Sequence, residues 1–248
     1  MRLTVLGCSG PYPAADVGTS GYLLTSNDTN LLLECGCGVV PKLWRAIEPG
    51  QLCAVVLTHF HFDHISDFPM LTTTVQFEKM KGMLDAEFRI PVYLPNEPAD
   101  MASFVTHLPG AEHFDFHFVK PGDTAWVGSF CLAFTDARHP LPCFGVKASD
   151  GQKCLYYTGD TNTMDRLAEQ ARGTDAILAD CGLRNEDWSE RAPHLSAAVC
   201  GRLAKDAGVS ALYLGHLPPY VKEDVLLSQA RAEFPAARLL HPSDEIEI

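Results

Sequence analysis

The sequence predicts an α/β protein in which helices cover the faces of a β-sheet. Short apolar runs bounded by turn residues dominate its first 60 residues, and later apolar runs alternate with segments of helical spacing. No linker, repeat or low-complexity stretch divides the chain. With 248 residues, of which 46% are hydrophobic, the chain can bury a sizeable core. We therefore expect one domain that spans residues 1–248.

The first half of the chain is expected to consist mainly of strands. Apolar runs between turn residues place these strands at residues 2–6, 22–25, 31–34, 53–58, 90–94, 115–119 and 124–135. Ser26-Asn27-Asp28 is favourable turn chemistry, so the second and third strands should form a hairpin. One helix is expected from Val39 to Ile47, because apolar residues recur there with helical spacing and Pro49-Gly50 follows.

The second half should alternate strand and helix. Strands are expected at residues 154–158, 176–179 and 211–214, and helices at 164–171, 197–207 and 222–232. Ser196 is a suitable N-cap for the second of these helices, and Gly208 is a suitable end. This alternation predicts an α/β domain with helices covering the faces of the sheet.

The charge balance argues against a broad nucleic-acid interface. The chain has 19 Lys and Arg against 31 Asp and Glu, a formal charge of −12, which repels polyanions. RNA is therefore a disfavoured partner, whereas small phosphoesters stay open because bound metal ions reverse the sign of a pocket. We expect no membrane partner, since no run approaches the roughly 18 apolar residues of a membrane helix.

The cysteines predict a reducing compartment. There are nine of them, an odd number without the spacing of a disulfide scaffold, and the start of the chain does not resemble a signal peptide. We therefore expect a cytoplasmic protein with reduced thiols. Cys35-Gly36-Cys37 lacks the second cysteine pair of a metal site, so we interpret it as two structural thiols.

The run His59-Phe60-His61-Phe62-Asp63-His64 is the sharpest motif in the sequence. It follows the strand expected at residues 53–58. His59 and His61 are two residues apart in extended chain, so they point the same way and can share a metal ion. Asp63 and His64 follow where the chain turns into a helix and can reach a second ion nearby. Imidazole and carboxylate without thiolate suit zinc, manganese or iron.

Three further residues follow apolar strands and could complete such a site. They are His139, Asp160 and His216. A lone His or Asp at such a position is more often a loop residue or a helix cap, but the His59–His64 motif changes that balance. Asp180 ends another strand, where it could orient a metal-bound histidine or serve as a cap.

Together these segments resemble the metallo-β-lactamase fold, and more narrowly its ribonuclease Z and phosphodiesterase branch. The resemblance is carried by the His59–His64 motif, Gly159-Asp160-Thr161, Gly215-His216 and Pro193-His194-Leu195-Ser196 with the helix and strand that follow. Gly7-Cys8-Ser9-Gly10 and Glu34-Cys35-Gly36 match more loosely. The resemblance implies a four-layer αββα sandwich with the site along one edge.

The resemblance also implies two divalent metal ions, zinc in the first place, with manganese or iron as alternatives. One ion would be held by His59, His61 and His139, the other by Asp63, His64 and His216, and Asp160 would bridge them. The nucleophile would be a hydroxide between the ions. Asp63 would orient it or take its proton, and His194 would stabilise developing charge and protonate the leaving group.

The implied function is hydrolysis of a small phosphodiester. Ribonuclease Z enzymes often carry a long basic arm before the bridging aspartate, but only residues 140–159 separate His139 from Asp160 here. A ribonuclease Z-type RNA 3′-end endonuclease, a lactonase or other ester hydrolase, and a non-catalytic metal- or RNA-binding member are the alternatives. A homodimer is expected from the habits of the fold, and Phe77, Met80 and Met83 could serve as core, pocket or subunit contacts.

Overall fold

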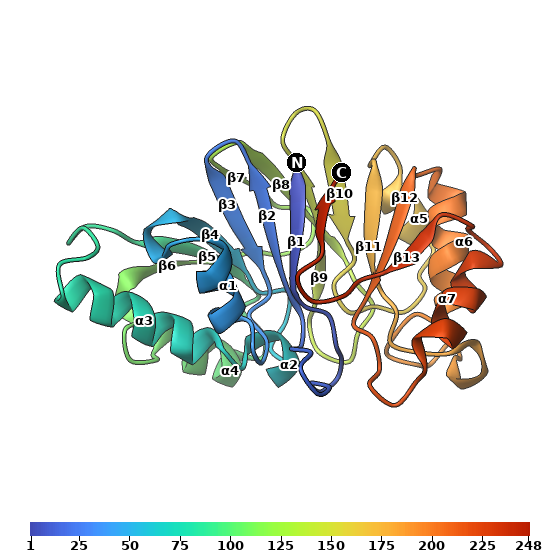
Figure 1. Ribbon diagram of the computed structural model, residues 1–248, viewed down its shortest axis with the longest axis horizontal. Coiled ribbons are helices and arrows are strands. Elements are labelled where there is room, and N and C mark those ends of the chain that lie inside the picture. The colour runs from blue at the N-terminus through green and yellow to red at the C-terminus, as the bar shows by residue number, and fades with distance from the viewer.

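Two seven-stranded sheets face each other in the computed structural model, which describes residues 1–248 (Figure 1). The first sheet has the order β14 (Glu245–Glu247), β1 (Arg2–Gly7), β2 (Gly21–Ser26), β3 (Thr29–Leu33), β4 (Leu52–Val56), β5 (Ile90–Leu94) and β6 (Phe114–Phe118). The second has the order β13 (Ala237–Leu239), β12 (Ala211–Gly215), β11 (Ala176–Asp180), β10 (Cys154–Tyr157), β9 (Phe144–Ser149), β8 (Phe130–Asp136) and β7 (Thr124–Val127). Strands β3–β6 run parallel to one another, as do β10–β13.

Helices cover the outer face of each sheet, on opposite sides of the molecule (Figure 1). The first sheet carries α1 (Val40–Ala46), α3 (Phe68–Met80) and α4 (Ala99–Thr106), and the second carries α5 (Leu167–Ala171), α6 (Ala197–Ala207) and α7 (Glu223–Arg231). The short α2 (Phe62–Ile65) lies at one edge of the sandwich. The expected four-layer αββα arrangement is therefore confirmed.

Strands buried on both faces explain the continuous apolar runs of the sequence. In β3, Leu31 and Leu33 belong to the 24-residue cluster between the sheets. Leu32 points the other way, into a 21-residue cluster under α1, α3 and α4. Because side chains alternate across a strand, a strand with a layer on each side needs apolar residues at every position.

The expected single strand at residues 124–135 is wrong. The chain turns at Gly128, whose φ is +52°, and forms the hairpin of β7 and β8. β9 was not predicted either, because Gly145 and Lys147 interrupt its apolar pattern. Gly145 is required by packing, since a Cβ atom there would lie 2.6 Å from Thr135 Oγ1. The short β13 and β14 and helix α4 also escaped prediction.

The ends of α6 agree with the expected signals in part. Gly208 ends the helix in the left-handed region, with φ +73°. Ser196 occupies the N-cap position, but its side chain makes no capping hydrogen bond. None of the helices in the molecule has both the length and the apolar character needed to cross a bilayer.

Candidate metal centre

The site lies where parallel strands of both sheets end. His59 follows β4 by three residues, Asp160 follows β10 by three residues, and His216 comes directly after β12. His139 follows β8, which is antiparallel to β9. Carboxyl ends of parallel strands meet at one edge of a sheet, so residues far apart in sequence converge there.

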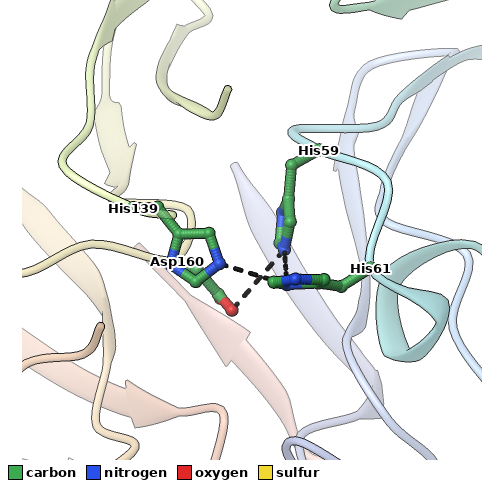
Figure 2. A group of neighbouring side chains, drawn as sticks. All are labelled: His59, His61, His139 and Asp160. Atoms are coloured by element: carbon green, nitrogen blue, oxygen red, sulfur yellow. Dashed lines mark hydrogen bonds and ion pairs between the residues drawn. The ribbon is translucent and has the colours of Figure 1, made fainter. Parts of the chain in front are cut away.

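One group of side chains surrounds a common point (Figure 2). His59 Nε2 lies 3.0 Å from His61 Nδ1, which in turn lies 3.1 Å from His139 Nε2. Asp160 Oδ2 lies 3.7 Å from His59 Nε2. His59 and His61 come from one side of the sandwich and His139 and Asp160 from the other. Three nitrogens and one carboxylate oxygen thus face one another, all within 4.8 Å.

A second group shares Asp160 with the first. His216 Nε2 lies 3.1 Å from Asp63 Oδ2 and 3.3 Å from Asp160 Oδ2. His64 Nε2 lies 3.6 Å from Asp63 Oδ2 and 3.3 Å from Asp160 Oδ1. Asp160 therefore stands between the two groups and faces both through its carboxylate.

These residues fit a pair of divalent metal ions. Two ligands on a tetrahedral zinc ion lie about 3.3 Å apart, which is close to the nitrogen–nitrogen distances of the first group. In the second group His64 Nε2 and Asp160 Oδ1 are buried without a hydrogen bond. Polar atoms are rarely left buried in this state, because the lost hydration is not replaced. Metal ions would satisfy these atoms, and the nitrogen and oxygen donors suit zinc, manganese or iron.

Glu34 is a buried carboxylate behind the second group. It accepts hydrogen bonds from the backbone N–H and hydroxyl of Thr58 and from Tyr157 Oη. Its Oε1 lies 3.3 Å from His64 Nδ1. The Thr58 hydroxyl also lies 3.1 Å from His59 Nδ1. Carboxylates and hydroxyls on the far nitrogen of a ligand histidine fix its tautomer and orientation.

Asp180 lies behind His194 at the end of β11. His194 Nδ1 lies 2.9 Å from Asp180 Oδ2, and Asp180 also accepts the backbone N–H groups of Thr161 and Gly182. His216 Nδ1 lies 3.5 Å from Asp180 Oδ1. The structure thus places Asp180 against both histidines. Although burial acts to lower it, the Asp180 carboxylate raises the pKa of His194 to about 9.

Burial and charge divide the other histidines into two classes. Burial holds the pKa of His59, His61 and His139 below the usual value, so these rings are neutral, which is the form that binds metals. Burial also acts to lower the pKa of His64 and His216, but the Asp160 carboxylate outweighs it, and both values are raised. Asp160 itself has a pKa well below its usual range, because the charges of His216 and His64 outweigh its burial.

The structure brings together all eight residues that the sequence singled out. These are His59, His61, Asp63, His64, His139, Asp160, His194 and His216. The sequence did not predict that Glu34 and Thr58 contact the candidate ligands His64 and His59, since neither has a recognisable spacing from the motif. Cys35 and Cys37 belong to none of the groups that could hold an ion.

Known proteins resemble this chain in sequence and fold. A family model described as "Beta-lactamase superfamily domain" matches residues 29–217. "Probable metallo-hydrolase YhfI" of Bacillus subtilis (strain 168) is 33% identical over 241 residues, which cover 94% of each chain. The crystal structure of YhfI superposes with a TM-score of 0.90 at 28% identity, over 99% of this chain and 98% of that one.

More distant similarity extends to enzymes named for RNA. "Ribonuclease Z" of Bradyrhizobium sp. (strain ORS 278) is 25% identical over 300 residues, which cover 100% of this chain and 99% of the relative. The crystal structure of the short form of human tRNase Z has a TM-score of 0.79 at 20% identity, over 100% of this chain and 99% of that one. At 20% identity, the similarity to human tRNase Z shows a shared fold and nothing more.

Proposed function

We propose that this chain, which belongs to the beta-lactamase superfamily and is a metal-dependent hydrolase, cleaves small phosphodiesters at a site for two divalent metal ions. The observation that carries the proposal is the position of Asp160, whose carboxylate lies within 3.7 Å of His59 Nε2 on one side and 3.3 Å of His64 Nε2 and His216 Nε2 on the other. In this proposal His59, His61 and His139 would hold one ion and Asp63, His64 and His216 the other, with Asp160 placed to serve both. Zinc is favoured by the near-tetrahedral spacing of the first group.

When bound, a metal pair lowers the pKa of a water molecule to about 7 and neutralises charge on the phosphoryl oxygens. The residues of the chain supply the rest. Asp63 Oδ2 faces His216 and His64 and lines the cavity, where it can orient an attacking water or take its proton. Asp160 and its histidine neighbours hold the reacting groups in place from the floor of the site.

His194 is the proposed proton donor to the leaving oxygen. Its Nδ1 faces Asp180, so its Nε2 is the nitrogen available to a substrate in the cavity that His194 lines. The contact with Asp180 favours the protonated ring, which is the form that can donate a proton and stabilise developing negative charge.

The size of the cavity supports a small substrate. The space above the site measures about 420 Å³, within the range of small-molecule pockets. Residues 140–159 contain β9 and β10, joined by a tight turn, and so belong to the second sheet. Lys153 in this segment is paired with Asp175 at 3.0 Å. This segment therefore offers no extended basic arm for RNA. RNA 3′-end cleavage is the second candidate, because the match to ribonuclease Z covers the whole chain.

A panel of substrates tests the proposal. The metal-loaded protein should hydrolyse bis(p-nitrophenyl) phosphate and cyclic nucleotides well, and a precursor tRNA poorly. His59→Ala should abolish turnover. His194→Ala should lower kcat by roughly 10²–10⁴-fold with metal content unchanged. Efficient cleavage of the precursor would establish the second candidate, and full activity of His194→Ala would remove the proton-donor role.

We also infer a homodimer and a cytoplasmic location. The interpretation of Phe77, Met80 and Met83 as core residues is wrong, because they are 55%, 70% and 70% exposed. With Met70, which is 54% exposed, Phe77 and Met80 form an apolar stripe along α3. Two such helices related by a two-fold axis would set Met70 against Met80.

The inferred cytoplasmic location rests on the nine free cysteines, which favour a reducing compartment.

A further inference from the structure

The wall of the site cavity contains residues that the proposed chemistry does not use. Besides the candidate ligands and His194, it is formed by one aromatic ring and three proline rings. The complete lining is Pro11, His61, Phe62, Asp63, His139, Pro140, Asp160, Pro193, His194 and His216. Proline rings are rigid and apolar and have no N–H group to donate. The wall above the ligands is therefore stiff and poor in hydrogen-bond donors.

Phe62 is exposed although its backbone is firmly held. It is the first residue of α2, between His61 and Asp63, and 67% of it is accessible. The backbone N–H of Ser66 donates to the Phe62 carbonyl at 2.8 Å, and the Ser66 hydroxyl donates to the same oxygen. An accessible phenyl ring forgoes the stabilisation that burial would give. A ligand whose flat apolar face covers the ring would recover it.

The cavity wall also contains no Lys or Arg. Arg138 is next to His139 in sequence, but its guanidinium donates to the carbonyl oxygens of Thr163 and Glu190. Asp63 and Asp160 are the charged carboxylates of the lining. A substrate phosphate other than the reacting one would find no Lys or Arg to pair with, since His194 serves the leaving oxygen in the proposed chemistry. Unpaired charge of this kind selects against a ligand.

We propose that Phe62 determines substrate specificity by stacking on a planar, uncharged ring, such as a nucleobase, of a phosphodiester that carries no second phosphate. This inference rests on the proposed function and narrows its substrate class. Stacking on an aromatic side chain is tolerant of base identity and, judged by alanine substitution, is worth roughly 10-fold in affinity or more per base. Phe62 thus selects for a flat ring, and a wall without Lys or Arg selects against additional charge.

A binding experiment tests Phe62 without turnover. The probes are adenosine 5′-monophosphate and ribose 5-phosphate, which share the phosphate and sugar and differ in the base. Calorimetric titration of the metal-loaded wild type should show roughly 10-fold tighter binding of the nucleotide. Phe62→Ala should bind both probes about equally, and Phe62→Trp should restore the preference. Phe104→Ala, which removes an exposed phenyl ring outside the cavity, is the matched control and should behave as wild type.

Equal binding of the two probes by the wild type would overturn the proposal, as would a base preference that survives in Phe62→Ala. Metal content is measured for each variant, so a loss of both probes together with the metal is recognised as damage to the site. If Phe62→Ala loses the metal and both probes, Phe62 supports the metal site itself, and the proposal that it acts only on the base is contradicted.

A kinetic experiment tests the charge selection. Thymidine 5′-(p-nitrophenyl phosphate) is compared with the same compound carrying a 3′-phosphate. The added phosphate should lower kcat/KM by about tenfold, whereas an equal or higher kcat/KM would contradict selection against a second phosphate. If neither ester is hydrolysed but nucleotide binding still depends on Phe62, the proposed function fails while the stacking role of Phe62 stands. If both esters are hydrolysed and nucleotide binding does not depend on Phe62, the proposed function stands while the stacking role of Phe62 fails.

Discussion

Glu34 shows how a single residue prepares the centre. Its backbone lies in the left-handed region, with φ +65°, a conformation that non-glycine residues rarely adopt. Its carboxylate accepts three hydrogen bonds from Thr58 and Tyr157 and lies 3.3 Å from His64 Nδ1. A fully buried carboxylate held in this way is suited to fix the His64 ring.

Replacement of Glu34 by Gln is expected to weaken metal binding. The amide is nearly isosteric but uncharged, so it no longer supports the N–H of His64 as a carboxylate does. Affinity for the second ion should fall by roughly 10–100-fold. Competition with a chromophoric zinc chelator measures this change. Glu48→Gln, on the surface, serves as control, and unchanged affinity in Glu34→Gln would show that Glu34 only stabilises the fold.

At the scale of elements, the loop between β1 and β2 packs against the centre. Gly10 in this loop lies so close to His216 that a Cβ atom there would be 2.3 Å from the ring. His216 itself has φ +52°. The loop and the end of β12 are also joined by hydrogen bonds of Gly10 N to Leu217 O and of Leu217 N to Cys8 O. The position of His216 therefore depends on a glycine some 200 residues away in sequence.

Gly10→Ala is expected to displace His216 and empty the second ion position. Metal analysis should show about one ion per chain in the variant against two in the wild type, with activity reduced at least 100-fold. Gly50→Ala is the matched control, because its Cβ would meet only the end of the Leu84 side chain, at 3.1 Å. Two ions in Gly10→Ala would show that the loop can move without cost to the site.

The turn between β9 and β10 carries a pH-dependent contribution to stability. Burial acts to raise the pKa of Asp150, but the Ser26 hydroxyl and the backbone N–H groups of Lys153 and Gln152 lower it to about 2, from 3.8. A folded-state pKa below the unfolded value stabilises the protein above pH 3.8, and this stability is lost as the pH falls towards 2.

Asp150→Asn should therefore lower the free energy of unfolding by about 1 kcal/mol at pH 7, a value that allows for screening by solvent. The difference from wild type should shrink between pH 4 and pH 2. Urea unfolding of the metal-free proteins at pH 7, 4 and 3 measures it, free of any effect of acid on bound metal. A difference that is constant over this range would exclude the carboxylate as its source.

For the molecule as a whole, part of the fold and of the candidate site could be predicted from sequence. Spacing alone predicted that His59 and His61 share a site, because two residues in extended chain point the same way. It could not place His139 or His216, which follow strands of the second sheet. Their assignment needed the resemblance to a family. Alternation of strands and helices predicted the α/β class, whereas the pairing of two sheets came from that resemblance.

Features that depend on shape escaped prediction altogether. Phe62 lies within the His59–His64 motif, whose spacing gives it no role, and only its exposure in the cavity lining distinguishes it. From sequence, Asp180 could orient a metal-bound histidine or serve as a cap. The structure places its carboxylate 2.9 Å from Nδ1 of His194. The closeness of Gly10 to His216 is likewise a property of the folded chain. Contacts between residues far apart in sequence leave no local pattern to read.

The α3 stripe makes a prediction about assembly. The wild type should sediment as a dimer at micromolar concentration, and Met80→Glu should be monomeric, because an unpaired charge in an apolar contact opposes association. Trp126→Glu, at an equally exposed apolar position on β7, should remain dimeric. A wild type that is monomeric throughout, or a Met80→Glu variant that still dimerises, would contradict this use of α3.

The number of metal ions needed for turnover shows whether the site works with two ions or with one. Metal-free protein is titrated with zinc while hydrolysis of bis(p-nitrophenyl) phosphate and bound metal are measured in the same samples. Because Asp160 stands between two groups of ligands, activity should rise to a break at two ions per chain. Asp160→Ala should bind both ions more weakly and stay inactive at this ratio. Full activity at one ion per chain, or no phosphodiester hydrolysis with two ions bound, would contradict a two-metal phosphodiesterase.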